Sequence, residues 1–166
     1  RPQRGSQAFW DALPAETRKT VTPIIAPLIR IDPIAVDLPM VKSAVFSSAN
    51  GPICAPCGNQ RTAFCVGAQT TQAAQTAGWD AHQLGNNADE LVAQIIQMQP
   101  QEPLIHLCGT HTRGNIAARL STAGLKTSEI AVYDQIAQSL SDAANIELHR
   151  ENPIILPLFS PRTARQ

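Results

Sequence analysis

The chain has 166 residues, of which 43% are hydrophobic and 16% charged, and its formal net charge is zero. This balance is typical of a globular protein with a real core and argues against disorder. No Lys/Arg cluster stands out and no apolar run approaches the ~18 residues of a membrane span, so we expect neither a nucleic-acid nor a membrane partner. With no charged-then-apolar leader, the sequence predicts a cytoplasmic protein, and its polar ends suggest missing structure on both sides.

The first forty residues predict a short helix at 6–13, an extended stretch at 22–31 and a proline-punctuated connector. After them, short apolar runs alternate with helical patterns. The expected strands are 43–46, 62–66, 104–108 and 129–133, and the expected helices are 70–77, 88–98 and 115–123. Continuous apolar runs of strand length are typical of parallel sheets with both faces covered. The alternation predicts a doubly wound α/β unit.

A second polar connector follows Tyr133, and residues 154–159 predict one further strand. We therefore expect an α/β protein of two flavodoxin-like parallel-sheet lobes joined by a two-stranded hinge. Residues 1–37 and 138–166 would form a first lobe whose C-terminal part is missing. Residues 38–137 would form a second lobe inserted into it.

Two segments of the chain repeat an apolar strand that ends in Phe-Ser, at Phe46-Ser47 and Phe159-Ser160. A hydroxyl at the start of a helix lies beside unpaired backbone N–H groups, which favour an anion. Simple N-capping by serine is the alternative for either segment alone. Because one copy belongs to each expected lobe, the repetition favours a small-molecule cleft between them.

Further turns follow the expected strands at 67–71 and 109–114, and Tyr133 closes the last strand. These turns would gather at one edge of a parallel sheet, where α/β proteins bind ligands. The edge offers hydroxyls, backbone N–H groups and Arg113, but few carboxylates. No nucleotide-binding glycine motif is present, the serines lack a Gly-x-Ser-x-Gly elbow and the four histidines are scattered. The pattern favours binding of a polyanion over hydrolysis.

Cys54 and Cys57 form a C-x-x-C whose surrounding prolines and Gly58 indicate a loop. A zinc site of this kind needs two further ligands at matching spacing, and no second C-x-x-C or H-x-x-x-H exists. His106 and Cys108 are near one another in sequence, but they alternate within a strand-like run. We favour incidental thiols, with redox or metal chemistry as open alternatives.

A series of short segments, each weak alone, resembles the uroporphyrinogen-III synthase family in order and approximate spacing along nearly the whole chain. The segments are 46–51 (FSSANG), 66–70 (VGAQT), Gly78, 87–91 (NADEL), 106–109 (HLCG), 132–133 (VY) and 159–162 (FSPR). The resemblance implies a two-domain fold with one domain inserted in the other. It also implies a lyase of tetrapyrrole biosynthesis that closes hydroxymethylbilane into uroporphyrinogen III, inverting the last ring and losing water. It implies no metal or organic cofactor, and it makes a monomer plausible.

The resemblance also implies roles for individual residues. Tyr133 matches the family's tyrosine and is the candidate catalytic residue; the alternative is a tyrosine that caps a strand end with its hydroxyl in water. Thr70 matches a threonine that faces the cleft, with N-capping as an equal alternative. The candidate substrate-binding residues are Ser47, Ser48, Asn50, Thr70, Gly109, Thr110, Ser160 and Arg162.

Two other function classes stay open at this point. A two-lobed, non-catalytic small-molecule binding protein would also use hinged α/β lobes. A thiol-redox protein would use Cys54 and Cys57, although their proline-rich context weighs against it.

Overall fold

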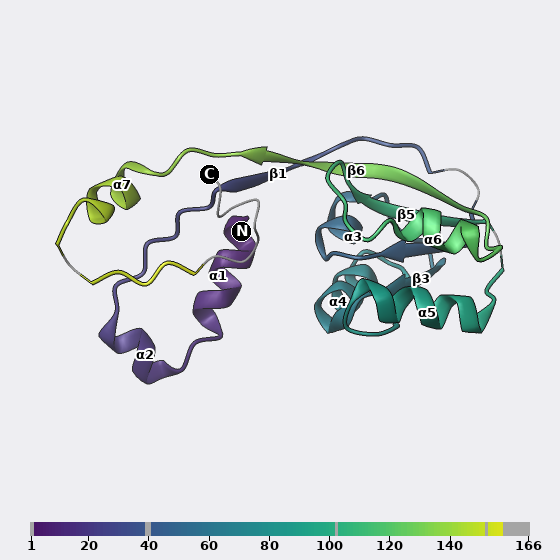
Figure 1. Cartoon of the computed structure of the whole chain (residues 1–166), viewed down its shortest axis with the longest axis horizontal. Coiled ribbons are helices and arrows are strands. Elements are labelled where there is room, and N and C mark those ends of the chain that lie inside the picture. The colour runs from purple at the N-terminus through teal and green to yellow at the C-terminus, as the bar shows by residue number, and fades with distance from the viewer. Residues whose placement is uncertain (1, 39–40, 102, 152, 158–166) are drawn as a thin grey trace. The chain divides into compact units, whose positions relative to one another are not determined.

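The computed structural model describes residues 2–38, 41–101, 103–151 and 153–157. The chain forms two compact units. One unit is Asp32–Asp134, and the other consists of the two flanking segments, which run up to Ile31 and from Gln135 onward. The chain passes between the units twice, within β1 (Ile29–Pro33) and within β6 (Thr127–Ala137), the two strands that lie side by side in Figure 1.

One six-stranded sheet in the order β1-β6-β5-β2-β3-β4 organises the described residues. The other strands are β2 (Ser43–Phe46), β3 (Thr62–Cys65), β4 (Asp80–Gln83) and β5 (Leu104–Gly109). All the pairings among β2 to β6 are parallel. Counted from β2, these five strands follow the order 3-2-1-4-5, whereas a flavodoxin-like sheet follows 2-1-3-4-5. The expected α/β class with a doubly wound sheet is confirmed, and the flavodoxin-like strand order is wrong.

Helices cover both faces of this sheet. α3 (Asn50–Cys54) and α4 (Gly67–Thr76) pack on the face of Phe46, where the α3 residue Gly51 approaches the phenylalanine ring. α5 (Ala88–Met98) and α6 (Ile116–Thr122) pack on the opposite face. The core on that side consists of Val45, Phe64, Leu84, Leu91, Val92, Ile95, Leu104, Ile116, Leu120 and Leu125. Burial on both faces explains why the strands of this unit read as continuous apolar runs.

The described part of the flanking unit contains three short helices, α1 (Gln3–Asp11), α2 (Ala15–Thr20) and α7 (Asp142–Leu148). In α1 and α2 no residue is buried, and in α7 only Ala144 is. No helix in the described part of the chain is long and apolar enough to cross a membrane.

The expectation of a second parallel-sheet lobe is wrong for the described residues, which form a single sheet. The strand expected at 154–159 is absent from its described part, because residues 153–157 are neither helix nor strand. Ile155 is 82% exposed and Leu156 60%. An apolar run becomes a buried strand only where neighbouring strands and helices cover it, and no described element covers this one. The second Phe-Ser turn, at Phe159-Ser160, lies outside the described residues.

Candidate functional site

The carboxyl ends of the parallel strands carry the predicted site residues of the Asp32–Asp134 unit. Ser47 follows β2, while Gly109 ends β5 and pairs in register with Tyr133 on β6. The strand order reverses between β2 and β5, and this is the point of a doubly wound sheet beside which ligands bind. Ser47 and Gly109 flank that point.

Ser47 is part of a hydrogen-bonded array that crosses three neighbouring strands. Its Oγ lies 3.0 Å from Nε2 of His106, and Nδ1 of His106 lies 3.0 Å from Oε2 of Glu129. The sheet register places these groups together, because His106 pairs with Val45 on one side and with Glu129 on the other. The four histidines look scattered in the sequence, yet the fold brings one of them, His106, beside Ser47.

The Glu129 carboxylate determines which groups in this array donate hydrogen bonds and which accept them. A carboxylate only accepts, so Nδ1 of His106 donates to Glu129 and Nε2 is left as an acceptor for the Ser47 hydroxyl. Ser47 then presents oxygen lone pairs, and not a proton, to a ligand. The His106 side chain is fully buried, and this burial lowers the pKa of His106. Glu129 acts in the opposite direction, but burial has the larger effect, so the ring is neutral. Because the ring is covered and both of its nitrogens are hydrogen-bonded, His106 orients Ser47 and does not carry a proton to a leaving group.

Tyr133 is almost fully buried, at 4% exposure, and its ring lies directly over Gly109. A β-carbon added at Gly109 would lie 2.6 Å from Cε2 of the tyrosine. The next residue, Thr110, donates its backbone N–H to the Tyr133 carbonyl at 3.0 Å, and its hydroxyl donates to Asp134. The ring is therefore packed against the end of β5, which differs from a tyrosine whose side chain extends into water.

The remaining predicted residues have different surroundings. Ser48 accepts a hydrogen bond from the backbone N–H of Asn50 at 3.3 Å, so both belong to the turn that begins α3. Thr70 lies inside the first turn of α4, whose N-cap is Val66, so the N-capping alternative for Thr70 is wrong. Its side chain is buried, at 5% exposure. Ser160 and Arg162 lie outside the described residues.

Three side chains in this region carry donors that suit a metal ion. Ligand atoms of His106, Cys108 and Glu129 all lie within 4.8 Å of one another. Burial, with the nearby Glu129 charge, raises the pKa of the Cys108 thiol to about 12, so without a metal it is a protonated thiol. Of the C-x-x-C cysteines, Cys54 ends α3 while Cys57 lies exposed in the following loop, and both are free thiols.

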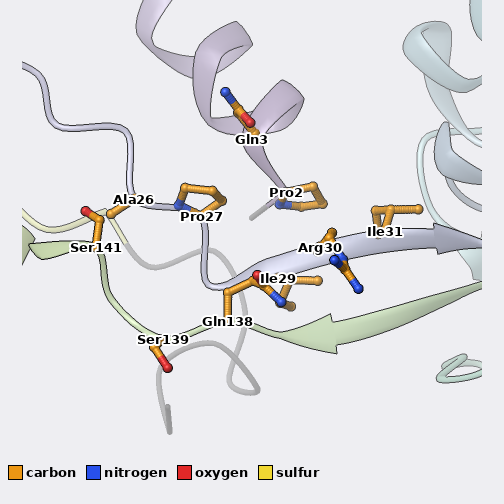
Figure 2. Close-up of a pocket in the computed structure, with 10 residues that line it drawn as sticks. All are labelled: Pro2, Gln3, Ala26, Pro27, Ile29, Arg30, Ile31, Gln138, Ser139 and Ser141. Atoms are coloured by element: carbon orange, nitrogen blue, oxygen red, sulfur yellow. The ribbon is translucent and has the colours of Figure 1, made fainter.

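A separate pocket of about 370 Å³ lies in the flanking unit (Figure 2). Its wall includes Pro27, Ile29 and Arg30 from one segment and Gln138 and Ser141 from another. Among the described residues, none of those predicted from the sequence to bind a ligand lines this pocket.

Comparison with known proteins identifies the family and supports the fold. The family model described as uroporphyrinogen-III synthase HemD matches residues 12–166. Among solved structures, the chain resembles uroporphyrinogen-III synthetase from Helicobacter pylori, with a TM-score of 0.56 and 12% identity. The alignment covers 75% of this chain and 61% of that one, and at this identity it supports the fold alone. No curated protein matches the chain. The family model spans nearly all of the sequence, and the chain belongs to the uroporphyrinogen-III synthase HemD family.

Proposed function

We propose that this protein is a uroporphyrinogen-III synthase, a cofactor-free lyase that closes hydroxymethylbilane into uroporphyrinogen III with inversion of the last ring and loss of water. Family membership supports the reaction class. The structural observation that carries the proposal is the packing of Tyr133 over Gly109, beside the point where the strand order reverses. This places a phenol at the edge where a doubly wound sheet binds ligands.

The reaction depends mainly on control of the substrate's conformation. Left alone, the linear tetrapyrrole closes without inversion, so the protein must hold the chain in the geometry that lets the substituted carbon of the last ring attack. Tyr133 would donate a hydrogen bond to the departing hydroxyl. Because a phenol has an ordinary pKa of ~10, its contribution would come from orientation more than from full proton transfer.

The substrate carries eight carboxylates, and we assign their binding to donors at the strand ends. Ser48 and Asn50 offer such groups in the described residues, and Ser160 and Arg162 would add further donors from the flanking segment. Thr110 would bind a carboxylate only by exchanging the hydrogen bond that its hydroxyl donates to Asp134. Gly109 lets the Tyr133 ring lie against β5. Thr70 would reach the substrate only after a change in its buried surroundings.

Ser47 would have a different partner from the other hydroxyls. Its proton is engaged by Nε2 of His106, so its free lone pairs suit a donor. The pyrrole N–H groups of the tetrapyrrole are donors, whereas its carboxylates only accept. We therefore assign Ser47 to a pyrrole N–H.

The proposal keeps the predicted division into a first lobe from residues 1–37 and 138–166 and an inserted second lobe from residues 38–137, with the substrate bound by a single protein chain. The alternative is a binding protein of the same family that holds a tetrapyrrole without cyclising it.

The test supplies hydroxymethylbilane to the protein and separates the uroporphyrinogen isomers after oxidation. The expected product is isomer III in excess over a reaction with heat-denatured protein. Isomer I alone would overturn the proposal. Isomer I alone together with tight binding of the bilane would identify the non-catalytic alternative.

A further inference from the structure

We propose that His106, Cys108 and Glu129 form a zinc site, with His106 bound through Nδ1 and one coordination position left for water or a ligand. This inference does not rest on the tetrapyrrole reaction, and it takes up the metal chemistry that the cysteine pattern left open.

The sheet itself brings the three donors together. His106 and Cys108 are two residues apart on β5, so their side chains emerge on the same face. Glu129 is the register partner of His106 on β6 and lies on that face too. Their ligand atoms lie within 4.8 Å of one another, and the nitrogen and oxygen of the His106–Glu129 pair are 3.0 Å apart. Neighbouring strands in the middle of a covered sheet form a rigid base for such a set.

The distances are close to what zinc requires. Zinc binds nitrogen, oxygen and sulfur at about 2.0–2.3 Å, so ligand atoms around a tetrahedral ion lie roughly 3–4 Å apart. The His106–Glu129 pair already meets this spacing, and the Cys108 sulfur, within 4.8 Å of both other ligand atoms, would move closer on binding the ion. One thiolate and one carboxylate neutralise the charge of the ion.

Binding of the ion would change the protonation of Cys108 and the tautomer of His106. The Cys108 thiol gives its proton to water, as a thiol does when it coordinates zinc. The Nδ1 proton of His106 is replaced by the metal, and the ring becomes the tautomer protonated at Nε2. That N–H then donates to Ser47 Oγ, 3.0 Å away. A hydrogen bond from the second ring nitrogen is the usual support of a zinc-bound histidine.

The surroundings distinguish this site from a closed structural one. His106 is fully buried and Cys108 is 4% exposed, whereas the Glu129 side chain is 41% exposed. The ion would therefore enter from the Glu129 side, and its fourth position would face that side. Three protein ligands with an open position are typical of zinc that binds an exchangeable ligand.

The site also affects Ser47. Without metal, the Ser47 hydroxyl donates to His106; with metal, it accepts from His106, and its proton becomes free to bind an anion. Metal binding would thus change Ser47 from an acceptor to a donor at the same position.

The test uses Co²⁺ as a spectroscopic probe for the zinc site, in protein that carries Cys54→Ser and Cys57→Ser so that the C-x-x-C cannot contribute. We expect one Co²⁺ per chain, with a thiolate charge-transfer band that equimolar Zn²⁺ removes. Cys108→Ser should abolish the band. Cys65→Ser is the matched control: Cys65 is also buried, but it pairs with Phe46 and lies on the opposite face of the sheet, so the band should be unchanged.

Glu129→Gln gives a second test that does not require a change in the core, because this side chain is partly exposed. It should weaken Co²⁺ binding at least tenfold, while Glu16→Gln, at an exposed helix position, should not. Circular dichroism verifies that each variant is folded. Absence of the band in the parent protein, its persistence in folded Cys108→Ser, or equal affinity in Glu129→Gln would each overturn the proposal.

Discussion

Gly109 and Tyr133 are register partners on neighbouring strands, and the tyrosine ring fills the space that a side chain at Gly109 would need. The glycine is required here for space: its neighbour is the tyrosine ring, with Cε2 and Cζ 2.6 and 2.7 Å from an added β-carbon. A buried aromatic ring cannot move by more than an ångström without disturbing the packing around it. The position of the candidate catalytic phenol therefore depends on the absence of one methyl group.

Gly109→Ala should destabilise the fold by about 1–3 kcal/mol, the usual cost of overpacking a dense site. In a Tyr133→Ala background the same substitution should cost much less, because the ring is gone. Urea unfolding of the two single variants and the double variant measures this coupling. Additive effects would contradict the proposed contact.

The His106 ring provides the second prediction. In metal-free protein, ¹⁵N NMR should show the tautomer protonated at Nδ1, because Glu129 accepts from that nitrogen and Ser47 donates to the other. Ser47→Ala should leave the tautomer unchanged while costing about 1–3 kcal/mol of stability, since a buried acceptor loses its partner. An Nε2 proton in the metal-free wild type would contradict this assignment.

The buried thiol of Cys65 predicts a loss of stability at high pH. Burial raises the pKa of this thiol from 9.0 to about 12, so the unfolded state loses the proton at lower pH than the folded state does. The stabilisation is complete below pH 9 and declines as the pH rises towards 12. Unfolding experiments across this range should show a steeper decline for wild type than for Cys65→Ala. Parallel pH profiles would contradict the prediction.

The fourth prediction concerns the N-cap of α5. Asn87 Oδ1 accepts hydrogen bonds from the backbone N–H groups of Asp89 and Glu90 at 3.0 and 2.9 Å. Asn87→Ala should cost about 1 kcal/mol, and Asn87→Ser should retain most of the stability because serine also caps. Thermal unfolding of both variants checks the order, and equal stabilities would count against a capping role.

The sequence predicted those helices and strands that a short stretch of residues identifies by itself. α5 was identified from its apolar spacing and its Asn cap, and the strands of the Asp32–Asp134 unit from continuous apolar runs. β4 was not predicted, because it lies at an edge of the sheet and only its Ala81 is buried. α3 was read as a loop, because its proline and the C-x-x-C that overlaps its end suggested an irregular segment.

The contacts of the site depend on the strand order, which the sequence did not supply. Ser47 and His106 are 59 residues apart, and His106 and Glu129 are 23 apart. Nothing local in the chain indicates that β5 lies between β2 and β6. With that order known, the alternation of side chains along each strand places all three residues on one face. The histidines appeared scattered only because the pairing of their strands was unknown.

Tyr133→Phe separates the role of the phenol from that of the ring. The ring would still pack over Gly109, so stability and substrate affinity should change little. If the hydroxyl assists departure of the leaving group, kcat should fall about 10- to 1,000-fold with KM nearly unchanged, since the lost interaction exists mainly in the transition state. Initial rates of isomer III formation measure the split. A raised KM with unchanged kcat would identify Tyr133 as a binding residue, and unchanged values of both would remove it from the reaction.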